Sequence, residues 1–413
     1  MFCLHLSIVG LLLNQVWLLN LEHSFQFLMF CLSLSAIGYY CYAMYAAIEF
    51  FAHPTPVNAD FHPPVSILKP ICGLDSDAYE NLASFCRQDY PEYQIVFGVQ
   101  DPRDPSVEVV KQIIHDFPMV DIQLVISDRV IGTNLKVSNL ANAAAEAKHN
   151  VLLLADSDIQ VKSDYLRQVV QPLQDSTVGV VTCMYRSQAQ GWVSAFEAIG
   201  ISTEFLPSVL VARKLEGMAF AMGATIVIRK SVLEAIGGFL AVASYLGDDF
   251  KLGNLPAQAG YQVVLSDYVV DHVLATESIA DFIHHQTRWT RGNRSARPLG
   301  YAGLIFTHGT ATSLIFLLAT GGSFLGWSVL GITWSLRSLM AWLVGVKKLS
   351  DPVARDLLWL VPLRDLVSFT LWCYSFIGNT IEWRGRRLRL TKGGKLVTLA
   401  PKPPKVRLAK PTW

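Results

Sequence analysis

The chain has 413 residues, of which 52% are hydrophobic and only 16% are charged. This composition excludes an ordinary soluble enzyme, because it suffices for one large soluble domain and still leaves on the order of a hundred residues for a bilayer. The formal net charge of +1 gives no reason to expect a nucleic acid partner. The seven cysteines lack any CxxC or CxxH spacing, so we expect reduced or membrane-buried thiols and no zinc site.

Residues 1–52 predict the amino-terminal membrane segment. Residues 24–48 contain no charged side chain and are long enough to cross a hydrocarbon core of about 30 Å at about 1.5 Å per residue. Residues 6–21 are also apolar but shorter, so they predict either a second short span or part of a hairpin. A cleaved signal peptide is disfavoured, because no Lys or Arg precedes the apolar run and a longer uncharged stretch follows.

Residues 60–300 alternate β-branched runs with helical stretches, which predicts an α/β domain with parallel strands. The strands are expected at 65–68, 93–99, 121–126 and 151–155, and the helices near 76–88, 106–117 and 136–148. Ligands of such sheets bind outside the carboxyl ends of the strands. No GxGxxG or P-loop motif follows the first strand, which disfavours a dinucleotide or P-loop site.

Two acidic motifs follow predicted strands. Asp101 comes shortly after the strand at 93–99, and Asp156 and Asp158 come directly after the strand at 151–155. Asp before Pro is ordinary turn chemistry, and a DxD motif can merely cap the next helix. Their shared position on the ligand edge favours function instead. We expect Asp101 to accept hydrogen bonds from a nucleobase or ribose, and Asp156 and Asp158 to hold Mg²⁺ or Mn²⁺ bridging two phosphates.

A third acidic motif, GDDF, contains Asp248 and Asp249. One alternative is a helix N-cap with a favourable dipole. A helix start is also a rigid mount for a base, so Asp249 is predicted to take the proton of an acceptor hydroxyl. Asp248 is its neighbour, whose like charge raises the proton affinity of the pair. Loss of Asp249 is expected to remove turnover more than binding.

A basic and aromatic stretch precedes the second apolar region, residues 310–381. Its members are His284, His285, Arg288, Trp289, Arg291, Arg294 and Arg297. Alone, this stretch fits an interfacial amphipathic helix equally well. After three acidic motifs, we favour a site in which His285, Arg288 and Trp289 stabilise a departing diphosphate.

Three further residues are candidates of lower specificity. Lys69 in ILKP and Lys136 in GTNLK are expected to contact the phosphates or the uracil side of a nucleotide, and either also fits a solvated lysine. His272 in DHV is either a third metal ligand or a structural side chain. We retain both lysines in the nucleotide-binding set.

Residues 310–381 predict the carboxyl-terminal membrane segments. Residues 310–336 are uncharged and residues 338–346 continue the run, which predicts one long tilted span or two short ones. The apolar stretch 199–211, inside the middle block, either rests at the interface and admits a lipid or belongs to the core.

The final part of the chain is mixed. Residues 357–381 are apolar except for Arg364 and Asp365, which are expected to pair inside a bundle or to mark an interfacial segment. Residues 382–413 predict a basic tail, with no acidic residue after Glu382. By the positive-inside rule, this tail and the catalytic domain are expected to be cytoplasmic.

Taken together, these motifs resemble the ceramide glucosyltransferase family of inverting, GT-A-type membrane glycosyltransferases. The resemblance covers nearly the whole chain, in family order: VSILKPICGLD, FCRQDYPEY, VFGVQDPRDP, GTNLKVSNL, ADSDI, GDDF and RW. It implies a Rossmann-like GT-A domain with a mostly parallel sheet, flanked by transmembrane helices. It also implies an active site formed by Asp101, Asp156, Asp249 and the pair Arg288 and Trp289.

One position departs from the family's (Q/R)xxRW box, because His285 stands where Gln or Arg is usual. With the segment RWTRGNRSARPLGYAGLIFTHG, it is more similar to the bacterial hopanoid branch, which adds N-acetylglucosamine to bacteriohopanetetrol. The resemblance therefore implies UDP-N-acetylglucosamine as donor, this lipid alcohol as acceptor, and the bacterial inner membrane as location. It does not indicate an oligomeric state.

Other functions compete with this interpretation. A ceramide glucosyltransferase using UDP-glucose is the nearest alternative. A processive polysaccharide synthase is disfavoured, because it needs a longer membrane bundle and Gln or Arg at position 285. A lipid or solute carrier would be expected to have many spans with internal symmetry. A catalytically inactive relative would not be expected to retain every carboxylate.

Overall fold

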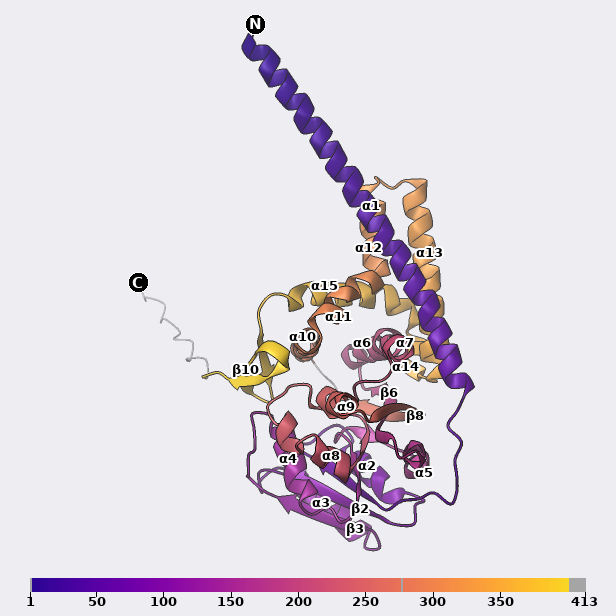
Figure 1. The fold of residues 1–413 in the computed structure, drawn as a ribbon, viewed down its shortest axis with the longest axis vertical. Helices are drawn as coiled ribbons and strands as arrows, with labels where there is room; N and C mark the ends of the chain where they lie inside the picture. The colour runs from indigo at the N-terminus through magenta and orange to yellow at the C-terminus, as the bar shows by residue number, and fades with distance from the viewer. Residues whose placement is uncertain (1, 276–277, 401–413) are drawn as a thin grey trace, which may run out of the picture.

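The computed structural model describes residues 2–275 and 278–400, apart from the side chains of residues 2–19. One long helix, α1 (Phe2–Ala52), rises away from an α/β domain, and two further helices, α12 (Gly309–Ala319) and α13 (Phe324–Ala341), lie along its lower half (Figure 1). Between these helices and the α/β domain lie α10 (Ile279–Ala296), α11 (Pro298–Gly303) and α15 (Val361–Ser375).

The α/β domain is built on an eight-stranded sheet with the order β3-β2-β1-β4-β7-β6-β8-β5. The strands are β1 (Val65–Pro70), β2 (Tyr93–Val99), β3 (Asp121–Ile126), β4 (Val151–Leu154), β5 (Ile159–Gln160), β6 (Val178–Ala189), β7 (Ile226–Arg229) and β8 (Gln262–Leu274). Four neighbouring pairs are parallel, and the three pairs that involve β5 or β7 are antiparallel. The predicted α/β class and mostly parallel sheet are therefore confirmed.

Short helices connect and cover the strands. They are α2 (Ala78–Ala83), α3 (Ser106–Asp116), α4 (Leu135–Ala144), α5 (Tyr165–Val169), α8 (Lys230–Ala235) and α9 (Asp248–Gln258). Every residue of β1 and β4 is buried, as expected for central strands with helices on both faces. The expected helix near 136–148 is α4, which begins where the Asn134 side chain accepts a hydrogen bond from the backbone N–H of Val137.

The middle of the chain contributes a helical run that the sequence leaves undecided. It consists of α6 (Trp192–Gly200), a π-helical turn (Ile201–Phe205) and α7 (Leu206–Glu216). Most of its apolar window is buried. The apolar stretch 199–211 therefore belongs largely to the interior.

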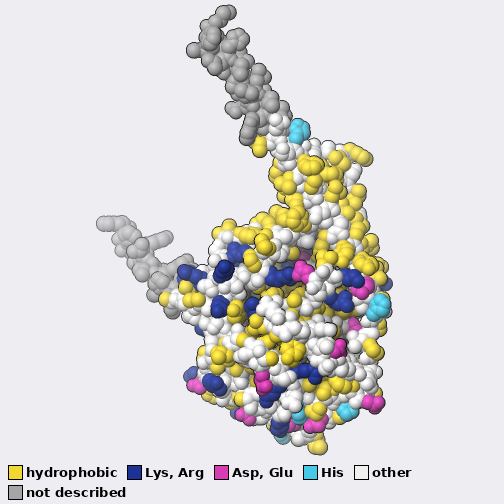
Figure 2. All heavy atoms as spheres, viewed as in Figure 1, with side chains coloured by type: hydrophobic (Ala, Val, Ile, Leu, Met, Phe, Trp, Pro, Cys, Tyr) yellow, Lys and Arg dark blue, Asp and Glu magenta, His cyan; other side chains and the backbone are white. Residues whose placement is uncertain are grey.

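Within the described part of the chain, three helical runs are long and apolar enough to cross a membrane: Asn20–Ala52, Trp192–Glu216 and Phe324–Lys348. A bent pair, Pro298–Thr307 with Gly309–Ala319, makes a fourth if it is one broken span. Figure 2 shows hydrophobic side chains gathered over α1, α12 and α13. The chain is a membrane protein, and its hydrophobic surface lies at one end of the molecule.

One prediction about these membrane segments is wrong. Residues 6–21 form neither a separate span nor half of a hairpin, because α1 is continuous from Phe2 to Ala52. Of the two alternatives for residues 310–346, the structure has two helices, because Gly321 and Gly322 adopt positive φ and end α12 before α13 begins.

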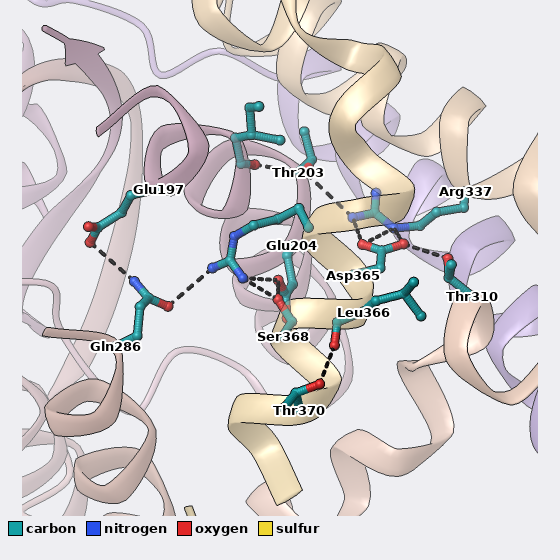
Figure 3. Close-up of polar contacts among 12 residues, drawn as sticks. Glu197, Thr203, Glu204, Gln286, Thr310, Arg337, Asp365, Leu366, Ser368 and Thr370 are labelled. Carbon is teal, nitrogen blue, oxygen red and sulfur yellow. Dashed lines mark hydrogen bonds and ion pairs between the residues drawn. The ribbon is translucent and has the colours of Figure 1, made fainter. Parts of the chain in front are cut away.

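The prediction that Arg364 and Asp365 pair with each other is also wrong. Adjacent residues on a helix point in different directions. Asp365 pairs with Arg337 of α13 at 2.7 Å, and its carboxylate accepts a hydrogen bond from Thr310. Arg364 instead donates to Gln286 of α10, and Figure 3 shows Gln286 apart from the pair of Asp365 and Arg337.

The last described segment is a second, three-stranded antiparallel sheet. Its strands are β9 (Thr380–Trp383), β10 (Arg386–Leu390) and β11 (Leu396–Thr398). Ile381, Leu388, Leu390 and Leu396 form a small core on one face of it. Residues 382–398 are therefore a folded unit, where the sequence predicts a tail, and residues 401–413 lie outside the described part.

Candidate active site

The DxD motif lies at the carboxyl end of β4, as the strand pattern predicts. The Asp156 carboxylate is 2.5 Å from the Lys136 ammonium, which projects from α4. The Lys69 ammonium donates to the backbone carbonyl of Asp156 at 2.8 Å and lies 3.6 Å from the centre of the Phe85 ring. Lys69 is fully buried. Lys69 therefore stabilises the turn from the interior of the domain, while Lys136 lies at the partly exposed edge of the turn.

Asp158 has a different cationic partner. Its Oδ2 atom lies 3.4 Å from Nε2 of His272 on β8, and Nδ1 of the same ring contacts the Ser187 hydroxyl at 3.0 Å. Burial alone would raise the pKa of Asp158, but the charge and hydrogen bond of His272 lower this pKa to about 2. Asp158 is therefore a carboxylate at neutral pH. In this structure His272 is its hydrogen-bonded neighbour.

The GDDF motif forms the first turn of α9. Asp248 is buried and accepts a hydrogen bond from the Asn134 side chain at 3.1 Å. Its other oxygen lies 3.7 Å from the Lys136 ammonium. Lys136 therefore bridges the two acidic motifs. Burial lowers the pKa of Lys136, but Asp156 and Asp248 outweigh it and raise this pKa above its usual range.

The Asp249 side chain approaches the same part of the site, near Asp156, from the other side of the first turn of α9. Its Oδ2 atom accepts a hydrogen bond from the Gly223 backbone at 3.2 Å. Burial and the adjacent charge of Asp248 raise the pKa of Asp249 to about 6. A carboxylate with a pKa near 6 at a helix start has the proton affinity that a general base needs at neutral pH.

Gly223 is a site residue that the sequence analysis missed. A Cβ atom at this position would lie 2.8 Å from Oδ2 of Asp156 and 3.4 Å from the Lys136 ammonium. Only a hydrogen fits there without displacement. Gly223 thus lies against both Asp249 and Asp156, and a lone glycine in AMGAT carries no signal of that position.

Asp101 lies just beyond the end of β2, on the expected edge of the sheet. Its carboxylate accepts hydrogen bonds from the backbone N–H of Arg103 at 2.9 Å and from the Arg103 guanidinium at 3.1 and 3.0 Å. Both side chains are exposed. In this structure Asp101 therefore closes its own turn, and its predicted role toward a nucleotide stays a prediction.

The basic box lies on α10. His285 Nδ1 is 2.7 Å from Oε1 of Glu197 in α6. Trp289 lies one turn further, with its ring 5.6 Å from His285 and 5.5 Å from Phe205. The guanidinium of Arg288 lies 5.5 Å from the centre of the Trp383 ring in β9. Arg288 therefore faces the second sheet, while His285 faces α6 and Trp289 faces the π-helical turn that follows it.

Ring contacts connect this box to the DxD motif. Phe205 lies 6.2 Å from Tyr185 of β6, and Tyr185 lies 5.5 Å from His272. His272 in turn contacts Asp158. The path His285, Trp289, Phe205, Tyr185, His272 runs through adjacent side chains. A continuous set of ring contacts therefore connects the predicted box to the DxD motif.

A buried polar network holds the box helix in place (Figure 3). Gln286 donates to Glu197 at 3.2 Å and accepts from Arg364 at 3.1 Å. Arg364 also donates to the hydroxyl of Ser368 at 2.5 Å, which donates to Glu204 at 2.5 Å. Figure 3 shows these residues side by side between α6, α10 and α15. Glu197, at the centre, has no sequence motif to mark it.

The donor set suits an oxygen-preferring divalent ion only in part. Among residues 20–275 and 278–400, no group of three or more His, Cys, Asp or Glu side chains is arranged to hold a metal ion. Asp156 and Asp158 supply two carboxylates, each about one third exposed. Mg²⁺ is commonly bound through one or two carboxylates, with substrate phosphates as further ligands. These two residues therefore fit an ion that arrives with a diphosphate.

Comparison with known proteins agrees with this geometry. The chain is 24% identical over 385 residues to ceramide glucosyltransferase 1 of Caenorhabditis elegans, covering 91% of this chain and 80% of that protein. It is 26% identical over 384 residues to ceramide glucosyltransferase 3 of the same organism, covering 90% and 81%.

A solved structure shares the fold. Mannosyltransferase PcManGT from Pyrobaculum calidifontis, in complex with GDP-Man and Mn²⁺, matches with a TM-score of 0.54 at 18% identity, covering 85% of this chain and 96% of that chain. The fold of the present domain is therefore that of GT-A-like glycosyltransferases. The model of glycosyl transferase family 21 matches residues 28–396. The chain thus belongs to glycosyl transferase family 21, and it is a sugar-transferring enzyme.

Proposed function

We propose that this enzyme moves a sugar from a UDP-sugar to a membrane lipid alcohol with inversion at the anomeric carbon. One observation carries the proposal: Asp249, with a pKa of about 6, accepts a hydrogen bond from Gly223, a residue so close to Asp156 of the DxD motif that an added Cβ would lie 2.8 Å from its carboxylate. This supports a proton acceptor near the motif whose two carboxylates would hold a diphosphate-bound ion. That pairing is what sugar transfer from a nucleotide diphosphate-sugar requires.

In the proposed reaction, Asp249 takes the proton of the acceptor hydroxyl as its oxygen attacks the anomeric carbon. The bond to the diphosphate oxygen breaks on the opposite face, so UDP leaves and the configuration inverts. Asp156 and Asp158 would hold Mg²⁺ or Mn²⁺, which neutralises charge on the diphosphate. His285 and Arg288 supply positive charge or hydrogen-bond donors to the leaving group, and Trp289 holds the box against Phe205.

Exposed apolar side chains support a lipid acceptor. Trp192, Ile279, Ile283 and Leu299 are exposed on α6, α10 and α11. These helices lie between the catalytic domain and the membrane helices (Figure 1). Figure 2 shows Lys and Arg side chains gathered below the hydrophobic end, which supports a cytoplasmic catalytic domain by the positive-inside rule.

For donor and acceptor we propose UDP-N-acetylglucosamine and bacteriohopanetetrol, in hopanoid glycolipid synthesis at a bacterial inner membrane. This rests on the resemblance carried by His285 and the segment after it. A second candidate is glucose transfer from UDP-glucose to ceramide, because the curated relatives at 24% and 26% identity are named ceramide glucosyltransferases.

A labelling experiment separates these candidates. Membranes that contain the enzyme are incubated with radiolabelled UDP-N-acetylglucosamine or UDP-glucose and either bacteriohopanetetrol or ceramide, with Asp249→Asn membranes as the control. Labelled bacteriohopanetetrol supports the first candidate, and labelled ceramide the second. A long labelled polymer without labelled lipid would favour a polysaccharide synthase. Equal labelling by Asp249→Asn would overturn the assigned mechanism.

A further inference from the structure

The second sheet, β9 to β11, is attached to the loops that carry the candidate donor site. The backbone N–H of Leu246, two residues before Asp248, donates to Gly394 at 3.0 Å. The Arg386 guanidinium donates to the carbonyl of Thr133, next to the start of α4, at 3.2 Å. Figure 1 shows the sheet beside α10 and near α4. The sheet therefore covers the edge at which Lys136 and the GDDF motif meet.

The turn between β9 and β10 contacts a third loop of the candidate donor site, the loop that follows β1. Trp383 and Arg386 are paired across the hairpin, so Arg384 and Gly385 form a two-residue turn. Their φ angles are 48° and 70°. Such turns prefer Asn-Gly, because both central residues need positive φ. Arginine at the first position is costly, and residues kept in costly conformations cluster at functional sites.

The side chain of Arg384 points to the carboxyl end of β1. It is exposed, and one nitrogen donates to the carbonyl of Cys72 at 2.8 Å. That is the only hydrogen bond of its guanidinium within residues 20–275 and 278–400, and no carboxylate in that part lies at ion-pairing distance. A guanidinium has five N–H donors. Most of its donors are therefore available to a bound ligand.

The residues around Arg384 place its remaining N–H donors beside the DxD motif. Asp75 follows Cys72 by three residues and accepts a hydrogen bond from Ser157, the middle residue of the motif. Burial raises the pKa of Asp75, and the positive charge of Arg384 opposes this rise. From the other side, Arg288 lies over the ring of Trp383. The turn thus lies next to Arg288 of the box, through the ring of Trp383.

We propose that Arg384 is a donor-binding residue, whose guanidinium hydrogen-bonds the diphosphate of the nucleotide sugar, with the β9–β11 sheet as the roof of the donor site. The inference rests on the function proposed above. A planar guanidinium matches phosphate oxygens in pairs, which a lysine ammonium does not. A phosphate-binding role explains why the turn has arginine at a position where glycine or asparagine would be more stable.

Arg384→Gly tests the proposal, because it removes the guanidinium and relieves the turn at once. Arg389→Ala is the matched control, since it removes an exposed arginine from β10, the strand that follows the turn. The full-length enzyme is purified in detergent. UDP affinity with Mn²⁺ is measured by calorimetry, KM is measured for donor and for lipid, and thermal unfolding is followed for each variant.

We expect Arg384→Gly to weaken UDP binding and raise the donor KM at least tenfold. The lipid KM should stay within twofold, and the unfolding temperature should be equal or higher. Arg389→Ala should match the wild type. UDP affinity of Arg384→Gly within twofold of the wild type overturns the inference. So does weaker binding accompanied by a lower unfolding temperature, which would indicate a structural role.

The wild type separates this inference from the proposed function. If it binds UDP and transfers sugar while Arg384→Gly is unaffected, only the role of Arg384 fails. If the wild type binds no UDP with either Mg²⁺ or Mn²⁺, the proposed donor fails and the inference with it.

Discussion

The Nδ1 atom of His285 lies 2.7 Å from the Oε1 atom of Glu197. The carboxylate belongs to α6 and is almost fully buried, whereas the imidazole belongs to the box on α10. A buried charge stays in place only when it is paired and hydrogen-bonded. Glu197 therefore fixes the direction in which the other ring nitrogen of His285 points.

Replacing Glu197 with glutamine should reduce kcat about tenfold, equivalent to about 1.4 kcal/mol, with a smaller effect on donor KM. The reason is that an amide holds the imidazole less firmly than a carboxylate does. Glu204→Gln is the control, because Glu204 contacts Ser368 and Arg364 rather than the histidine. In a double-mutant cycle with His285→Ala, the two losses should not add. Additive losses would contradict a positioning role.

The raised pKa of Asp249 predicts a pH profile. A base with a pKa of about 6 loses activity as it is protonated, so kcat should fall about tenfold per pH unit below pH 6. Asp249→Asn should lower kcat by about 10² to 10⁴ at pH 8 while UDP binding persists. Kinetics from pH 5 to 9 and calorimetry with UDP give both measurements. A profile that is flat between pH 5 and 8 would count against Asp249 as the base.

The same shift has a consequence for stability. The folded pKa of about 6 lies above the ordinary value of 3.8, so the stabilising contribution of Asp249 is full below pH 3.8. It is lost as pH rises through 6. Asp249→Asn should therefore raise the unfolding temperature at pH 8 and not at pH 4. Asp60→Asn, at an exposed site, should change neither. A lower unfolding temperature for Asp249→Asn at pH 8 would contradict this balance.

Gly223 should tolerate no side chain. The Cβ of alanine would lie 2.8 Å from Oδ2 of Asp156, so Gly223→Ala must displace either the carboxylate or the loop. We expect UDP binding with Mn²⁺ to weaken about tenfold, as overpacking typically costs about 1–3 kcal/mol. Gly331→Ala is the control, because no atom lies within 4 Å of its added Cβ. Equal UDP affinities in the two variants would show that the contact is unimportant.

Gly200 is predicted to matter for stability instead. An added Cβ would lie 2.4 Å from one guanidinium nitrogen of Arg364 and 2.5 Å from another. Gly200→Ala should displace Arg364 and lower the unfolding free energy by about 1–3 kcal/mol. Thermal unfolding in detergent checks this, with Gly303→Ala, which has open space around its added Cβ, for comparison. An unchanged unfolding temperature would mean that α15 can shift freely.

The parallel half of the domain could be predicted from the sequence because its strands are short, apolar and separated by strong helix formers. The runs at 65–68, 93–99, 121–126 and 151–155 all became strands. The antiparallel strand β7 could not be predicted, because IVIR has no alternation to show which neighbours it joins. Strand order is set by tertiary packing rather than by local pattern.

The candidate site likewise contains residues that could be predicted from the sequence and residues that could not. The DxD and GDDF motifs could be found because paired acids after a strand or at a helix start have specific uses. Glu197 and Gly223 could not, since their roles depend on contacts with residues far along the chain. The fold of residues 382–398 was missed because a run of arginines predicts a solvated tail, and the four apolar side chains of its core are scattered along the sequence.

The hydrogen bond from Arg384 to Cys72 joins residues 312 positions apart. During synthesis, all three acidic motifs, the box and the candidate spans therefore precede the residue that reaches back to the end of β1. On the proposed role of Arg384, a chain that ends before β9 lacks this contact and should bind nucleotide sugar more weakly than the full chain.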